Sequence, residues 1–103
     1  MNYHTDSRYS GAQIFYAQGR VEGEALAAAI QSSMRALNPE NTRRASAGDY
    51  YVLGICEAAA LVECGFLSNA AERALLTTPE YQARVAAAVA DGIVAYWHQL
   101  AYD

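Results

Sequence analysis

Two stretches of the chain show the three- to four-residue apolar period of amphipathic helices. The first begins at Gly23 and ends before Asn38-Pro39, with apolar residues at Leu26, Ile30, Met34 and Leu37. The second follows Thr78-Pro79, a capping residue and a proline suited to the first helical position; its apolar face contains Val85, Val89, Ile93, Tyr96 and Leu100. Between them, Asn69 and Glu72 have capping-box spacing, which predicts a short helix over residues 69–76.

Three other stretches have the composition of short strands: residues 11–16, 50–53 and 60–64. The last lies in a low-polarity run bounded by glycine, a pattern typical of a parallel strand that is covered on both faces. Residues 1–10 and 41–48 are polar and are expected to form loops. The alternation of strands and helices predicts an α/β or α+β domain. Three strands make an incomplete sheet, so we expect the other strands to lie elsewhere.

Composition narrows the range of functions. A chain of 103 residues forms one domain or part of one. Its net charge of -4 and its lack of lysine argue against a nucleic-acid-binding surface. We expect no transmembrane segment, because no apolar run approaches the roughly 20 residues that span a bilayer, and no signal peptide is recognised. Cys56 and Cys64 lack metal-ligand spacing and are expected to be small buried apolar residues.

Glu63 interrupts the apolar pattern of the third strand. Alternation places Leu61 and Glu63 on one face and Val62 and Cys64 on the other. An unpaired buried charge is costly, so this carboxylate is either part of a site or part of a structural ion pair, for example with Arg43 or Arg44. Desolvation favours the protonated form of a carboxyl group, which suits proton transfer near neutrality. The two histidines, His4 and His98, lack metal-ligand spacing and are expected at the surface.

The segment Val62-Glu63-Cys64-Gly65-Phe66-Leu67-Ser68-Asn69 resembles a signature of the zinc-dependent N-acetylmuramoyl-L-alanine amidases, the peptidoglycan amidases of cell walls and spore cortex. Further segments resemble this family in the same order along the chain. Residues 10–16 resemble the strand after its last zinc histidine, and residues 44–53 resemble the segment before the signature. Glu80-Tyr81-Gln82 and Asp91-Gly92-Ile93 fit its closing helix.

The resemblance implies a fold, a reaction and a role for one residue. The family fold is a three-layer α/β domain with a twisted, mostly parallel sheet flanked by helices. The family hydrolyses the amide between N-acetylmuramic acid and L-alanine in peptidoglycan, with Zn2+ held by two histidines and a glutamate. A further glutamate of the signature strand assists as general acid and base, and this role falls on Glu63. Activity on peptidoglycan implies an extracytoplasmic location, in the cell envelope.

The chain also departs from the family pattern. The last zinc histidine normally stands in an I-H-x-N context, and Met1-Asn2 fits the x-N, which places that histidine immediately before Met1. All three zinc ligands would then lie upstream, and His4 is not among them. Residues 57–60 also lack the proline expected before the signature strand. We therefore expect residues 1–103 to be the C-terminal portion of a catalytic domain, through a truncated gene, an internal methionine taken as the start, or a deliberate fragment.

Two functions follow as hypotheses. The first is an amidase domain that is inactive in this form because the chain supplies one catalytic residue and no metal ligand. The second is a non-catalytic, amidase-like protein that binds an amidase, its regulator or the cell wall. A sheet edge left without its neighbouring strands could pair with another chain or with a second copy of this one.

Overall fold

The computed structural model of the chain describes residues 11–65 and 69–102. His4, Met1-Asn2 and the Phe66-Leu67-Ser68 part of the signature lie outside the described residues. The elements are, in order, β1 (Gln13–Tyr16), α1 (Val21–Leu37), β2 (Ser46–Ala47), the 3-10 helix η1 (Tyr51–Gly54), β3 (Leu61–Glu63), α2 (Ala70–Leu76) and α3 (Pro79–Tyr102). They form a mixed α/β structure, as the sequence predicts.

The described strands form one sheet in the order β2-β1-β3. Strand β1 is central and pairs parallel with β2, with Phe15 opposite Ser46. It pairs antiparallel with β3, with Gln13 opposite Glu63. The expectation of a parallel strand covered on both faces is therefore wrong for β3 within this sheet. Its residues are half-buried, and its run of apolar residues reflects contact with the core on one side only.

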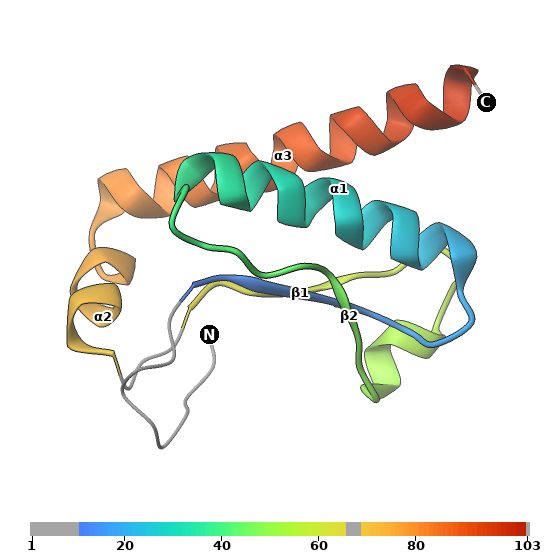
Figure 1. Cartoon of the computed structure of the whole chain (residues 1–103), viewed down its shortest axis with the longest axis horizontal. Coiled ribbons are helices and arrows are strands. Elements are labelled where there is room, and N and C mark those ends of the chain that lie inside the picture. The colour runs from blue at the N-terminus through green and yellow to red at the C-terminus, as the bar shows by residue number, and fades with distance from the viewer. Residues whose placement is uncertain (1–10, 66–68, 103) are drawn as a thin grey trace.

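Both long helices lie on the same face of the sheet (Figure 1). Helix α1 packs directly on β1, and α3 packs mainly on α1. The two helices approach closely at Gly92, where an added Cβ would lie 2.5 Å from the Cα of Ile30. The core between these layers is formed by Ala12, Ile14, Ala27, Ile30, Met34, Leu76, Tyr81, Val85 and Ala88.

A buried glutamine on α1 completes the hydrogen bonding of β1. The Gln31 side chain is fully buried. Its Oε1 accepts a hydrogen bond from the backbone N–H of Ile14 (2.9 Å), and its Nε2 donates to the carbonyl oxygen of Ala12 (3.0 Å). Strand β2 pairs with β1 only from Phe15 onward, so Gln31 satisfies the backbone groups that β2 does not reach.

The helix signals are confirmed at the residue level. Asn69 Oδ1 accepts a hydrogen bond from the backbone N–H of Glu72 at 3.0 Å and caps α2. Thr78 precedes α3, and its Oγ1 accepts from the N–H of Tyr81 at 3.3 Å. Pro79 is the first residue of α3, where the missing N–H of proline costs no hydrogen bond.

Three local predictions are wrong. Residues 50–53 do not form a strand, because the N–H of Leu53 donates to the Tyr50 carbonyl and closes a 3-10 turn. The loop expected over residues 41–48 contains β2, which pairs only through Ser46 and Ala47. Cys56 is exposed, because it lies in the turn region that follows η1. Cys64 fits its prediction better, since it packs partly buried against the core.

Candidate functional site

Glu63 lies at the end of β3, on the sheet face that points away from the helices. Val62 and Cys64 pack against the core beneath α1. Successive side chains of a strand point to opposite faces, so Leu61 and Glu63 point to the other face. This confirms the alternation predicted from the sequence. Glu63 is half-buried, so its carboxylate is neither fully removed from solvent nor fully exposed to it.

The alternative of a structural ion pair is not supported in the described part of the chain. There, no ion pair joins Glu63 to Arg43 or Arg44. The Arg43 guanidinium donates to Gln13 Oε1 at 3.3 Å, and the Arg44 side chain is exposed. Gln13 lies opposite Glu63 in the pair of β1 with β3. Arg43 therefore hydrogen-bonds to the residue across from Glu63.

A second carboxylate, Glu72 of α2, ties together the segments around Glu63. Its Oε2 accepts a hydrogen bond from the backbone N–H of Gly11 at 2.7 Å, just before β1 begins. Its carboxyl group also lies where a Cβ at Gly65 would be, so a side chain at Gly65 would displace it. Glu72 therefore holds the start of β1 near the end of β3. The sequence predicts only the capping role of this residue, because spacing does not reveal a contact across 61 positions.

The described residues do not fit a zinc site by themselves. Among them, no group of three His, Cys, Asp or Glu side chains could hold a metal ion. Burial raises the pKa of the Cys64 thiol, and the adjacent Glu63 carboxylate adds to the rise. A thiol that stays protonated at neutral pH is a poor nucleophile and a poor metal ligand. Among the described residues, two carboxylates, Glu63 and Glu72, therefore lie around the end of β3, and Glu63 stays the candidate for proton transfer that the sequence predicts.

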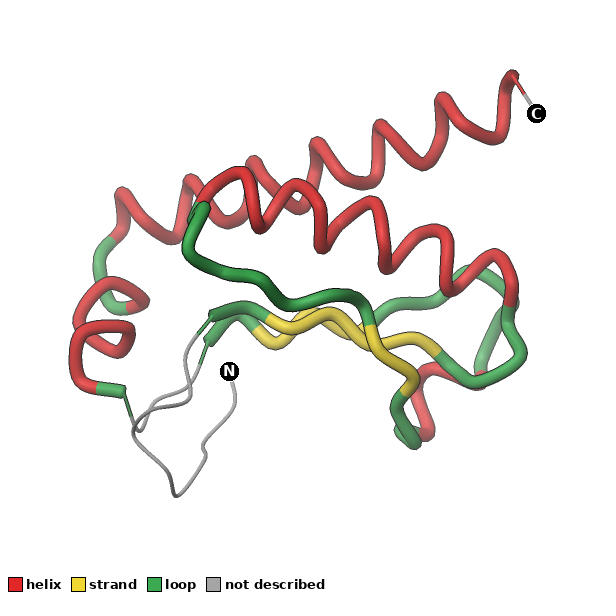
Figure 2. The backbone as a smooth tube through the Cα atoms, in the orientation of Figure 1, coloured by secondary structure: helices red, strands yellow, loops and turns green. Residues whose placement is uncertain are grey.

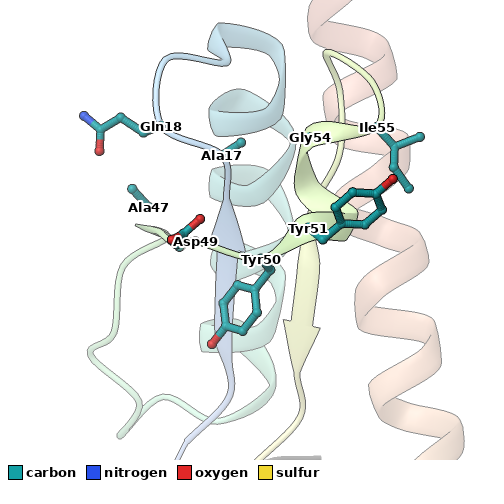
Figure 3. A pocket seen from close by; sticks show the side chains of 9 residues that line it. Ala17, Gln18, Ala47, Asp49, Tyr50, Tyr51, Gly54 and Ile55 are labelled. Atoms are coloured by element: carbon teal, nitrogen blue, oxygen red, sulfur yellow. The ribbon is translucent and has the colours of Figure 1, made fainter.

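A pocket of about 670 Å³ lies at the opposite end of β1 from Glu63. Figure 3 shows Tyr50 in front of β1 with α1 behind the strand, so the pocket opens on the face away from the helices. The Tyr50 ring packs on Phe15, with 5.3 Å between ring centroids. Ala17 lines the pocket. Glu63 lies opposite Gln13, which precedes Ala17 by four residues, and four residues of extended chain span roughly 13 Å. This pocket and the predicted catalytic residue are therefore separate features.

None of the helices in residues 11–65 and 69–102 is long and apolar enough to cross a membrane.

Comparison with known proteins relates this arrangement to one family. A sequence profile of the N-acetylmuramoyl-L-alanine amidases matches residues 1–95. The germination-specific N-acetylmuramoyl-L-alanine amidase of Bacillus subtilis is 39% identical over 100 residues, which cover 94% of this chain and 42% of that protein. The family is generally zinc-dependent.

Solved structures of N-acetylmuramoyl-L-alanine amidases are also similar to this chain. The CwlD amidase from Clostridioides difficile, determined in complex with the GerS lipoprotein, superposes with a TM-score of 0.92 at 35% identity, covering 100% of this chain and 52% of that one. The catalytic domain of CwlV, an N-acetylmuramoyl-L-alanine amidase from Bacillus (Paenibacillus) polymyxa, superposes with a TM-score of 0.79 at 30% identity, covering 94% and 54%. The chain thus spans about half the length of these relatives. It belongs to the N-acetylmuramoyl-L-alanine amidase family.

Proposed function

We propose that this chain is the C-terminal part of a hydrolase that cleaves the amide between N-acetylmuramic acid and L-alanine in peptidoglycan. The observation that carries the proposal is the family match over residues 1–95, within which Glu63 lies at the end of its strand. The similarity to a germination-specific amidase favours the spore cortex as the substrate and the cell envelope as the location.

Glu63 is the proposed general acid and base. Its carboxylate accepts a proton from the attacking water, and the carboxyl group then donates a proton to the leaving amine of L-alanine. The absence of a pairing arginine in the described residues leaves the carboxylate free for this role. The described residues hold no metal-binding cluster, and the family resemblance places the zinc ligands before the matched segment, so we propose that zinc is bound in that part of the domain.

The first prediction concerns activity. The 103-residue chain alone, with or without added zinc, should release no new amino groups from purified peptidoglycan. A chimera in which residues 1–103 replace the matching part of the C. difficile amidase should release them. In that chimera, Glu63→Gln should lower kcat by about 10²- to 10⁴-fold, the usual contribution of a general acid or base, while bound zinc is retained.

The control is Glu40→Gln, which alters an exposed carboxylate outside the strands and should leave kcat unchanged. Unchanged turnover in the Glu63→Gln chimera would reject the role of Glu63. Zinc-dependent turnover by the 103-residue chain alone would show that its activity does not require the rest of the domain.

A second candidate function is a non-catalytic binding protein. It is favoured by the lack of a metal-binding cluster in the described residues and by a relative that was solved in complex with a lipoprotein. Pull-down with an intact amidase, with a lipoprotein partner and with peptidoglycan distinguishes the two functions. Binding by the zinc-free chain, together with an inactive chimera, would favour the binding protein.

A further inference from the structure

The pairing of β1 with β3 ends at Glu63, although both segments continue beyond it. Gln13 and Glu63 form the final pair of the ladder, and the same register continued by two positions places Gly11 opposite Gly65. A side chain occupies this place. Glu72 Oε2 accepts a hydrogen bond from the Gly11 N–H at 2.7 Å, and the carboxyl group of Glu72 lies where a Cβ of Gly65 would be. One carboxylate of α2 therefore lies against both segments at the point where their ladder stops.

Gly11 is a fixed anchor for this contact. Its φ of +89° lies in the left-handed region that favours glycine. The buried Asn41 packs against it, since an added Cβ would lie 3.0 Å from Asn41 Cγ. Asn41 Nδ2 also donates to the carbonyl oxygen of Ala12 at 3.1 Å. Because Gly11 is held from this side, its hydrogen bond to Glu72 fixes the position of the carboxylate, and the carboxylate in turn limits where Gly65 can lie.

Capping of α2 does not account for these contacts. The cap is made by Asn69 Oδ1 with the backbone N–H of Glu72, and any side chain at position 72 would leave that N–H in place. Gly65 does not have a positive φ that would require glycine. The three atoms nearest to an added Cβ at Gly65 all belong to the Glu72 side chain. The missing side chain at Gly65 therefore makes room for the carboxylate.

We propose that Glu72 is a positioning residue for Glu63. Its carboxylate holds the end of β3, and thereby the place from which the Glu63 side chain projects. The inference rests on the proposed function, which assigns proton transfer to Glu63. A reacting group that is misplaced by about 1 Å can lose about 100-fold in rate, so the strand end that carries it must be held. A carboxylate suits this task, because charge-assisted hydrogen bonds are about twice as strong as neutral ones.

Two substitutions in the chimera with the C. difficile amidase break the contact in different ways. Glu72→Ala deletes the carboxylate, and Gly65→Ala displaces it. Each should lower kcat by about 10- to 100-fold, while KM and bound zinc stay unchanged. Glu72→Gln keeps an acceptor for the Gly11 N–H and should retain most of the turnover. Glu80→Ala is the matched control: it removes an exposed carboxylate from the first turn of α3 and should leave kcat unchanged.

The double variant shows whether the two residues act through one contact. If Gly65→Ala acts by displacing the Glu72 carboxylate, it should lower kcat no further once Glu72→Ala is present. Additive losses in the double variant would overturn the proposal. So would unchanged kcat in both single variants, or a raised KM with kcat unchanged. Circular dichroism identifies a single variant that fails to fold, and the other single variant then decides.

Amide hydrogen exchange of the 103-residue chain tests the positioning without any activity. The Tyr16 carbonyl accepts from Gly48 on the β2 side, so alternation along β1 turns the residue opposite Glu63 toward β3. The N–H of Glu63 is therefore bonded within the last pair of the ladder. Glu72→Ala should speed exchange at Gly11 and Glu63 by about tenfold, because a charge-assisted hydrogen bond is lost next to this pair. An unprotected Gly11 N–H in the wild type, or unchanged exchange at Glu63 in Glu72→Ala, would overturn the proposal.

The two measurements separate this inference from the proposed function. An inactive chimera, together with faster exchange at Glu63 in the Glu72→Ala chain, would support the positioning contact and contradict the amidase activity. A chimera that is sensitive to Glu63→Gln but not to Glu72→Ala or Gly65→Ala would contradict the positioning role and leave the activity established.

Discussion

At the scale of single residues, the hydrogen bond between Tyr96 of α3 and Glu22 of α1 makes helix packing sensitive to alkaline pH. The Tyr96 hydroxyl donates to Glu22 Oε2 at 2.5 Å. This hydrogen bond, with smaller contributions from burial and from the charges of Glu22 and Glu57, raises the pKa of Tyr96 to about 12. Deprotonation of the phenol would remove the donor and place two negative charges side by side.

The sign of the pH effect follows from the raised pKa. A tyrosine has a pKa of about 10 in the unfolded chain, so the folded state binds this proton more tightly. The stabilisation is complete below pH 10 and is lost as the pH rises from about 10 to 12. Below pH 10, Tyr96→Phe should lower the free energy of unfolding by about 1 kcal/mol. Above pH 10, the free energy of unfolding of this variant should fall less steeply with pH than that of the wild type. Urea unfolding at pH 8 to 11.5 measures this.

Tyr51→Phe is the control for this prediction, because the Tyr51 side chain is 94% exposed. The Tyr51→Phe variant should follow the wild-type pH profile. If Tyr96→Phe also followed the wild-type profile, the hydrogen bond to Glu22 would not contribute to stability.

The residues that sequence could predict are those whose information is local. Strand alternation places Glu63 and Val62 on opposite faces, and capping spacing identifies Asn69 as the start of α2. Gln31 and Glu72 could not be predicted in the same way. Each is polar and lies on a helix, but each accepts a hydrogen bond from a backbone N–H in or just before β1, 17 and 61 positions away. Only the packed structure shows that Gln31 satisfies backbone groups of the strand and that Glu72 holds the segment before it.

At the scale of elements, the contact between α1 and α3 depends on the absence of a side chain at Gly92. In an isolated helix, Gly92→Ala would be stabilising by up to about 1 kcal/mol. Here the new Cβ would lie 2.5 Å from the Cα of Ile30 and 2.9 Å from its backbone nitrogen. Backbone atoms cannot rotate away, so the helices must separate. We expect Gly92→Ala to destabilise the chain by about 1–3 kcal/mol, measured by urea unfolding.

A second substitution on the same helix shows whether helix propensity or packing determines the effect of Gly92→Ala on stability. Ala87 is exposed on α3, so Ala87→Gly should cost only the propensity difference of about 1 kcal/mol. The two variants make opposite changes to glycine content and should both destabilise. Stabilisation by Gly92→Ala would show that the helices are not closely packed at this point.

Residues 50–53 show why element type could not be predicted everywhere. Tyr, Val and Leu favour strands by composition, but β propensity depends on a neighbouring strand and a surface to pack on. Here only Leu53 is buried, while Tyr51 and Val52 are exposed. With one anchor and no partner strand, the segment forms the 3-10 turn that brings Leu53 into the interior. The three longer helices were predictable because their apolar period extends over several turns or begins at a clear cap.

At the scale of the whole molecule, apolar surface remains uncovered on both sides of the core. Figure 2 shows the C-terminal turns of α3 diverging from α1, and Ile93, Val94, Trp97 and Leu100 are exposed there. The face of the sheet away from the helices has no helical layer in the described residues (Figure 1). The sequence predicts the fold class and the order of most elements, but the uncovered faces appear only when the elements are placed in space.

These uncovered faces lead to a prediction about folding. Short chains bury a small fraction of their surface, and stability is a small difference between large opposing terms. With only one face of its sheet covered by helices, the isolated chain should unfold in a broad transition, with a free energy of unfolding below about 5 kcal/mol, or should associate. Calorimetry and sedimentation at several concentrations measure both properties.

Pairing with the amino-terminal half should sharpen the transition and raise its midpoint, because the partner covers apolar area that water otherwise contacts. A sharp, concentration-independent transition of the monomer at high temperature would instead mean that helices α1 and α3 and the three strands already form a complete core.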